Sequence, residues 1–194
     1  MDAMKIVPMT ALGAAGPAAV ARVFVDGYRK DLAAMRADDD AWEQALASSF
    51  VPELMWCAVI NNEVVGIAAL SDATSRAMYP VFADLRAHLG LGRAAMLWAV
   101  MRPLFVERLP LPTGAGYVES VATLSSHRGQ GIASALLTHL ETLGPTVMTL
   151  DVTDVNPARS LYAKLGYRET SRKKAAVPRL VGFNEHIYMR KNLL

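Results

Sequence analysis

The chain has a single cysteine, Cys57, among its 194 residues. One cysteine cannot form a disulfide within the chain, which excludes the small secreted scaffolds held together by disulfides. Its four histidines, at positions 88, 127, 139 and 186, are scattered, and none has the spacing of a metal site. The sequence therefore predicts no metal centre and a buried strand position for Cys57.

Long apolar runs and strong charge are also lacking. The most apolar segment, residues 89–105, is interrupted by Arg93 and Arg102, so it falls short of the roughly 20 residues that span a bilayer. The N-terminal apolar stretch is cut by prolines and Arg22, unlike a signal peptide. The net charge is only +2 and dispersed, without the basic patch typical of nucleic-acid binding. We expect a cytoplasmic protein with neither a membrane nor a nucleic acid as partner.

Apolar residues make up 53% of the chain, enough for one core, and we expect one domain over residues 1–194. Periodicity and turn residues predict alternating strands and helices. The expected strands are 4–10, 55–60, 63–70, 117–124, 146–152, 167–170 and 185–191; the expected helices are 17–35, 40–50, 76–89, 91–108, 132–143 and 157–165. Pro80 and Pro103 can break or kink the expected helices 76–89 and 91–108. This order predicts a mixed α/β fold with a central sheet flanked by helices.

A glycine-rich turn stands between the expected strand 117–124 and the expected helix 132–143. It reads Arg128-Gly129-Gln130-Gly131-Ile132-Ala133. Free backbone N–H groups and the helix dipole make such a turn a ready site for a phosphate. A P-loop would need a lysine after Gly131, and a dinucleotide fingerprint would need glycine where Ser134 stands. The pattern Arg-x-x-Gly-x-Ala fits throughout, although an ordinary strand-to-helix turn would look similar.

A second motif runs from Asn156 to Tyr167. Asn156 is a good N-cap, proline follows it at the first helical position, and Gly166 is a suitable left-handed residue at the helix end. Tyr162 lies on the apolar face of this helix by its spacing. Read locally, the segment is a capped amphipathic helix in which Tyr162 only packs.

Together, residues 117–170 resemble the GNAT superfamily of acyl-CoA N-acyltransferases, although Ser125-Ser126 stands where many relatives have Pro-Glu. The resemblance implies the GNAT fold and acetyl-CoA as cofactor. It implies that Asn156 contacts the pantetheine arm and that Tyr162 protonates the departing thiolate, a role suited to a phenol that stays protonated at neutral pH. The cofactor-binding residues that it implies are Val121, Ala122, Thr123, Arg128, Gly129, Gln130, Gly131, Ile132, Ala133, Ser134, Asn156 and Tyr162.

In this family the pantetheine arm lies beside the strand before the turn, and a bulge near the centre of that strand turns a backbone N–H toward the thioester oxygen. Val121, Ala122 and Thr123 occupy that region here. Such a fixed donor would stabilise the oxyanion that forms during transfer. Glu119 is the only carboxylate on this strand. It could take a proton from the acceptor amine or attract the ammonium ion. The alternative is an ordinary strand residue with a structural partner.

The resemblance therefore predicts an acetyl-CoA-dependent N-acetyltransferase in which a primary amine, of a small molecule, attacks the thioester directly. The alternatives are a protein N-terminal acetyltransferase, like those of ribosomal proteins, and a non-catalytic acyl-CoA-binding module. Residues 71–116 form a helical insertion before the cofactor strand. It could pack on the sheet, form a wall of the acceptor pocket, or provide the interface of a homodimer.

Overall fold

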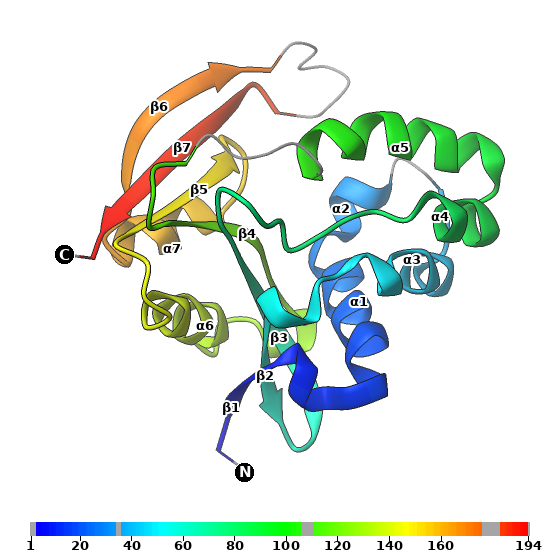
Figure 1. Cartoon of the computed structure of the whole chain (residues 1–194), viewed down its shortest axis with the longest axis horizontal. Coiled ribbons are helices and arrows are strands. Elements are labelled where there is room, and N and C mark those ends of the chain that lie inside the picture. The colour runs from blue at the N-terminus through cyan, green and yellow to red at the C-terminus, as the bar shows by residue number, and fades with distance from the viewer. Residues whose placement is uncertain (1–2, 34–35, 106–110, 176–182, 194) are drawn as a thin grey trace.

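The computed structural model describes residues 3–33, 36–105, 111–175 and 183–193. Within these residues seven strands form one sheet in the order β1-β2-β3-β4-β5-β7-β6 (Figure 1). The strands are β1 (Lys5–Pro8), β2 (Met55–Ile60), β3 (Glu63–Ser71), β4 (Ala115–Thr123), β5 (Val147–Thr153), β6 (Arg168–Lys174) and β7 (Glu185–Asn192). Every neighbouring pair is antiparallel except β4 and β5, which are parallel.

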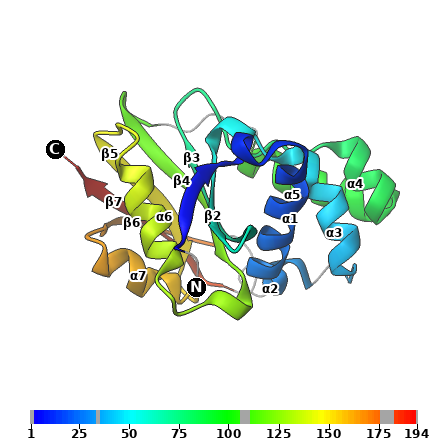
Figure 2. The same ribbon diagram turned by 90° about the horizontal axis from the view of Figure 1, so that it is seen from below.

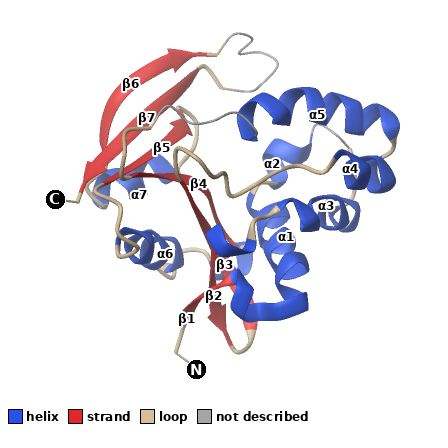
Figure 3. Ribbon diagram, in the orientation of Figure 1, coloured by secondary structure: helices blue, strands red, loops and turns tan. Residues whose placement is uncertain are grey.

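Helices cover both faces of the sheet, as the ribbons in Figures 2 and 3 show. The helices are α1 (Gly16–Gly27), α2 (Arg29–Leu32), α3 (Asp39–Leu46), α4 (Phe82–Leu89), α5 (Leu91–Phe105), α6 (Ile132–Glu141) and α7 (Ala158–Lys164). The α1 to α5 helices lie on one side of the sheet, and α6 and α7 lie on the other. Packing is close on both faces. A Cβ on Gly27 would lie 2.5 Å from the Ala122 side chain, and one on Gly66 would lie 2.5 Å from the Ile132 side chain.

The two central strands diverge soon after they begin. The parallel pairing of β4 with β5 joins only Ala115–Tyr117 to Val147–Thr149. Beyond that point the described parts of these strands run on to Thr123 and Thr153 without pairing with each other (Figure 1). The backbone groups along both strands are therefore left for another partner, because an unpaired strand edge is a template for further hydrogen bonds. Side chains from both faces of the sheet can also approach one another here.

A bulge interrupts β4 at Glu119 and Ser120. The register pairs Ala68 with Val121 and Leu70 with Val118, so β4 has one more residue than β3 over this stretch. A bulge of this kind places two consecutive side chains on the same face of a sheet. The Glu119 and Ser120 side chains both lie on the side of the sheet that carries α1. Glu119 accepts a hydrogen bond from the Ser71 hydroxyl, and Ser120 interacts with the Tyr28 side chain. The strand therefore has a bulge, as expected, but it lies at Glu119 and Ser120, just before the region of Val121 to Thr123 where it was expected.

The order of strands and helices follows the prediction, but several bounds differ. The expected strand 4–10 ends at Pro8, where a 3-10 helix over Met9–Ala15 begins. The expected helix over 76–89 is wrong in its first part, since α4 begins only at Phe82. Pro80 explains the late start, because a residue before proline disfavours helical backbone. The expected helix 17–35 is broken at Tyr28, and β6 extends to Lys174. The end of the expected helix 91–108 lies outside the described residues. None of the described helices is long and apolar enough to cross a membrane.

Candidate active site

The glycine turn opens α6 in the conformation that a phosphate site needs. Gly129 and Gly131 have φ values of 77° and 80°, a left-handed backbone that side chains disfavour. The turn is exposed, no side chain caps α6, and its first backbone bond runs from Ala135 N to Gly131 O at 3.0 Å. The N–H groups of Ile132, Ala133 and Ser134 precede this bond and lie in the first helical turn, where an anion is favoured.

The chain before the turn is fixed to α1. The Asp26 carboxylate accepts hydrogen bonds from the Ser125 backbone N at 2.5 Å and from its hydroxyl at 3.1 Å. The Arg128 Nε donates to the Thr123 carbonyl at 3.4 Å, which holds the exposed guanidinium beside the turn. The Thr123 hydroxyl is buried without a hydrogen-bond partner in the described part of the chain. Such a group calls for a ligand or water. The turn, its arginine and this hydroxyl together fit a phosphorylated cofactor that runs back along β4.

The ends of α7 determine where Tyr162 lies. Asn156 is exposed, and its Oδ1 accepts a hydrogen bond from Ala158 N at 2.9 Å, so it caps a helix that begins one residue later than expected. Gly166 has the predicted left-handed backbone, with φ 92°. The bonds from Tyr167 N to Tyr162 O and from Gly166 N to Ala163 O complete a Schellman motif. The Tyr162 and Tyr167 rings meet edge-on at 5.9 Å, the apolar contact that usually accompanies this motif.

Tyr162 is 9% exposed, and its phenol remains a proton donor in this position. Burial raises the pKa of Tyr162, and the nearby Tyr28, Tyr167 and Asp151 raise it further. Burial also raises the pKa of Tyr28 to about 12, although hydrogen bonds with the Val121 backbone and the Ser120 side chain lower it. Tyr162 from α7, Tyr28 just after α1 and Asp151 from β5 therefore interact electrostatically where β4 and β5 diverge.

Glu119 is held by three groups of the protein. Its carboxylate accepts hydrogen bonds from Arg76 Nη2 at 2.8 Å, from Ala77 N at 2.9 Å and from the Ser71 hydroxyl. The Glu119 and Arg76 side chains are only 2% and 5% exposed. This buried ion pair fastens the loop after β3 across β4. The role of Glu119 as a base stays a prediction. In this arrangement the Arg76 guanidinium already neutralises the charge of the Glu119 carboxylate.

Replacing Arg76 with methionine is expected to lower the free energy of unfolding by about 3–5 kcal/mol, because it leaves the Glu119 carboxylate buried without its counter-ion. Urea unfolding would measure the loss. The matched control is Arg22→Met, which removes a pair with Glu63 whose side chains are 44% and 45% exposed, and it should cost about 1 kcal/mol or less. Adding Glu119→Leu to Arg76→Met should recover most of the stability. Equal losses in the two single variants would contradict this account.

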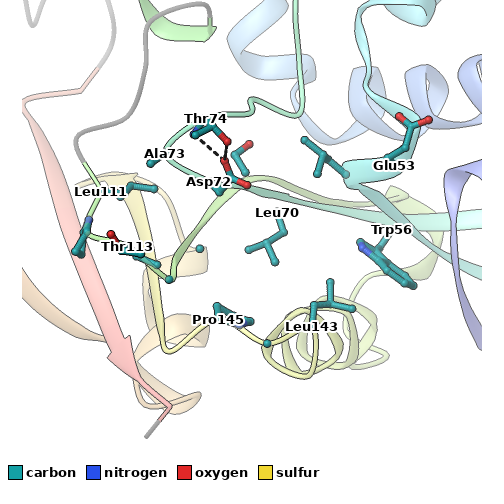
Figure 4. A pocket seen from close by; sticks show the side chains of 17 residues that line it. Glu53, Trp56, Leu70, Asp72, Ala73, Thr74, Leu111, Thr113, Leu143 and Pro145 are labelled. Carbon is teal, nitrogen blue, oxygen red and sulfur yellow. Dashed lines mark hydrogen bonds between the residues drawn. The ribbon is translucent and has the colours of Figure 1, made fainter.

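A cavity of about 590 Å³ lies elsewhere, at the start of β4. Leu70, Trp56, Leu143 and Pro145 form much of its apolar wall, and Asp72 lies at its rim (Figure 4). None of the residues predicted to bind cofactor or to act in catalysis lines it. The described residues also contain no group of three histidine, cysteine, aspartate or glutamate side chains that could hold a metal ion.

Comparison with known proteins decides the family. The model of the acetyltransferase (GNAT) family matches residues 22–167, most of the chain and both motifs. The chain belongs to the GNAT family of acetyltransferases. It is therefore an acyltransferase enzyme that uses acetyl-CoA. No curated protein sequence matches it.

Solved structures share the fold of this GNAT acetyltransferase at low sequence identity. The ribosomal-protein-S18-alanine N-acetyltransferase from Escherichia coli is 15% identical with a TM-score of 0.58, over 98% of this chain and 94% of its own. The IAA acetyltransferase from Bacillus cereus is 12% identical with a TM-score of 0.52, over 98% of this chain and 99% of its own. The NatC complex bound to Gag peptide and CoA is 15% identical with a TM-score of 0.56, over the full length of both chains. At these identities the likeness supports the fold alone.

The GNAT fold brings most of the predicted site residues to one end of β4. Gly129 to Gly131 form the exposed turn, and Ile132 to Ser134 are the first residues of α6, with the Ile132 side chain buried. Thr123 lies on the face that α6 covers, because its strand partner Gly66 packs against Ile132. Val121 shares this face by strand alternation. The Ala122 side chain instead faces α1, so only its backbone is left for the cofactor.

No sequence pattern indicates that several residues near the predicted acetyltransferase site belong to it. Tyr28, Arg76, Tyr117, Asp151 and His186 come from five separate segments, and each interacts with a side chain or strand of the site only in the folded chain. A short motif could not have found them, since their contacts join residues that lie far apart in the sequence.

Proposed function

We propose that this enzyme transfers an acetyl group from acetyl-CoA to the primary amine of a small molecule. When bound, acetyl-CoA supplies an activated acetyl group whose C–S bond breaks as the C–N bond to the amine forms. One observation carries the proposal: two sets of functional groups, from opposite sides of the sheet, meet where β4 and β5 separate. The phosphate turn and Tyr162 come from the α6 and α7 side, and the polar groups Glu119 and Asp151 come from the opposite side.

Each residue has a physical role in this proposal. The backbone N–H groups of Gln130 to Ser134 would bind the pyrophosphate, and the Arg128 guanidinium would add positive charge. Val121, Ala122 and Thr123 would hydrogen-bond along the pantetheine arm through their backbone, and the exposed Asn156 side chain would contact the same arm. Tyr162 would donate its proton to the departing thiolate. Glu119 would take a proton, or anchor the ammonium ion, only if the acceptor replaces part of its bonding to Arg76.

The loop over 72–81 supports a small acceptor. The buried Arg76–Glu119 pair holds this loop across β4, on the face where Asp151 lies, and further bonds tie Ala77 O to Val51 N and Tyr79 N to Ser49 O. A face covered in this way favours a compact molecule over a long peptide. Acetylation of a protein N-terminus is the second candidate, favoured by the fold shared with the S18 and NatC acetyltransferases.

Release of CoA from acetyl-CoA, measured with a thiol reagent, would test the proposal against a panel of small primary amines and an array of N-terminal peptides. We expect saturable, acceptor-dependent release with at least one small amine, and its N-acetyl product by mass spectrometry. Transfer confined to peptides would replace the small molecule with a protein acceptor. Tight acetyl-CoA binding without transfer to any amine would indicate a non-catalytic acyl-CoA-binding module.

A further inference from the structure

A chain of polar contacts links three strands on the face of the sheet opposite α6 and α7. The Tyr117 hydroxyl of β4 donates a hydrogen bond to Oδ1 of Asp151 on β5. The other oxygen of that carboxylate, Oδ2, lies 3.0 Å from Nδ1 of His186 on β7. One carboxylate therefore holds a phenol on one side and an imidazole on the other. Neither the glycine turn nor the Tyr162 motif includes any of these three residues.

The arrangement defines which nitrogen of His186 is free to react. A carboxylate beside Nδ1 favours the tautomer that carries its proton there, and Nε2 is then an acceptor. The described residues provide no hydrogen-bond partner for Nε2, and the His186 side chain is 32% exposed. The Phe183 ring meets the imidazole edge-on at 4.7 Å, which limits its rotation. An imidazole fixed by a carboxylate, with its second nitrogen accessible, is the usual form of a histidine general base.

The Asp151 carboxylate links the group formed by Tyr117, Asp151 and His186 to Tyr162. Asp151 lies in the part of β5 that has separated from β4, just beyond the last parallel pair at Thr149. The charge of Asp151 contributes to the raised pKa values of Tyr162, Tyr28 and Tyr188, although burial is the main cause for each. The carboxylate is thus within electrostatic reach of the expected general acid. Tyr162 extends from α7 on one side of the sheet, and His186 stands on the other.

We propose that His186 is the general base that takes a proton from the acceptor amine, with Asp151 and Tyr117 as positioning residues. This rests on the proposed function, which it deepens. In the step, an N–H bond of the ammonium ion breaks, its electron pair stays on the nitrogen, and the proton passes to Nε2. The imidazolium that forms is stabilised by the Asp151 carboxylate, and Tyr162 gives its own proton to the thiolate on the opposite side.

Glu119 is less suited to this step in the observed arrangement. Arg76, Ala77 and Ser71 already donate to its carboxylate, and its side chain is 2% exposed. A proton could reach it only after the ion pair opened. The Asp151 and His186 side chains are 26% and 32% exposed, so an acceptor can reach the pair.

The charged and titratable groups around His186 come from four elements. Asp151 faces it from β5, and Lys173 on β6 is its partner in the strand register. Tyr188 follows on the same face of β7, and its pKa is raised by burial and by Asp151. Tyr117 on β4 acts through Asp151, with the Arg76 guanidinium 5.9 Å from the Tyr117 ring centre. Any change of rate with pH must be judged against these groups.

The pH dependence of kcat/KM, measured with an acceptor found in the amine panel, tests the proposal. The wild-type rate should fall at acidic pH, where an imidazole is protonated and cannot accept a proton. His186→Gln is expected to lower kcat about 100-fold and to remove this acidic limb, with acetyl-CoA affinity unchanged by calorimetry. Added imidazole should restore activity to His186→Ala, since a small base can then enter the site. Asp151→Asn should lower kcat, because the imidazolium that forms loses its counter-charge.

Glu119→Gln is the comparison variant for the other candidate base. Because it breaks the buried pair with Arg76, urea unfolding must first show that it is folded, and the folded protein should keep the acidic limb. The proposal is overturned if His186→Gln keeps the limb and a rate within about three-fold of wild type, or if the limb disappears in Glu119→Gln instead. Failure of imidazole to rescue a folded, acetyl-CoA-binding His186→Ala protein would also overturn it. If the wild-type protein binds acetyl-CoA but acetylates no amine, the proposed function itself fails, a result distinct from all of these.

Discussion

Replacing Gly131 with glutamate is expected to weaken acetyl-CoA binding by roughly 100-fold or more, about 3 kcal/mol in binding free energy. Two effects act together. Gly131 has φ 80°, where a residue with a side chain is strained by about 1–2 kcal/mol. The added carboxylate also stands at the N-terminus of α6, where it repels the pyrophosphate and takes the place that an anion would occupy. Calorimetric titration with acetyl-CoA would measure the change.

The chain offers a matched control for backbone strain. Gly90, at the end of α4, also has φ 80°, is exposed, and has no protein atom within 4 Å of a built Cβ, as at Gly131. The ψ of Gly90 is 160°, a backbone region almost confined to glycine, whereas the ψ of Gly131 is 3°. Gly90→Glu therefore imposes at least as much strain, with the same charge, at a site away from the turn. We expect it to leave acetyl-CoA affinity within about two-fold of wild type. Equal losses of affinity in both variants, or none in Gly131→Glu, would refute the phosphate-turn assignment.

Replacing Tyr162 with phenylalanine is expected to lower kcat by about 100- to 1,000-fold while acetyl-CoA still binds with wild-type affinity. The substitution removes only the hydroxyl, and the edge-on packing of the ring against Tyr167 is kept. Because burial raises the pKa of Tyr162, the phenol stays protonated through the neutral range and can donate to a thiolate. Steady-state kinetics with the acceptor would give kcat, and calorimetry would give the affinity.

Tyr167→Phe is the control for this experiment. Its hydroxyl is buried without a partner among the described residues, and burial raises the pKa of Tyr167 as well. The two tyrosines differ in position, since Tyr167 follows the end of α7 and Tyr162 is influenced by Tyr28 and Asp151. Turnover within about three-fold of wild type is expected for Tyr167→Phe. A Tyr162→Phe protein with full turnover would remove the general-acid role.

The local parts of the site could be predicted from sequence because their causes are local. Gly131 and Gly166 have left-handed backbone, as their places at helix ends indicate. Asn156 caps α7, and the order of elements gives the mixed sheet. Pro80, which the sequence marks as a possible break in the expected helix 76–89, outweighs the periodic pattern before it, and α4 begins only at Phe82.

Glu119 shows the limit of such reasoning. As the only carboxylate on its strand it was the natural choice for a base, but its environment depends on the loop after β3. Arg76 lies 43 positions earlier in the chain, and the sequence has no pattern that pairs the two residues. The bulge at Glu119 and Ser120 also depends on the register with β3, which is set by packing on both faces.

The sequence by itself determined the left-handed backbone of the glycine turn and the helix that carries Tyr162, because each depends on backbone preferences within about ten consecutive residues. Only the tertiary structure decided which polar groups stand across the sheet from Tyr162. The contacts of Asp151 with Tyr117 and His186 span three strands, and the order of those strands brings them together. Long-range pairing is set by the burial of the whole sheet, and no short segment of the chain contains that information.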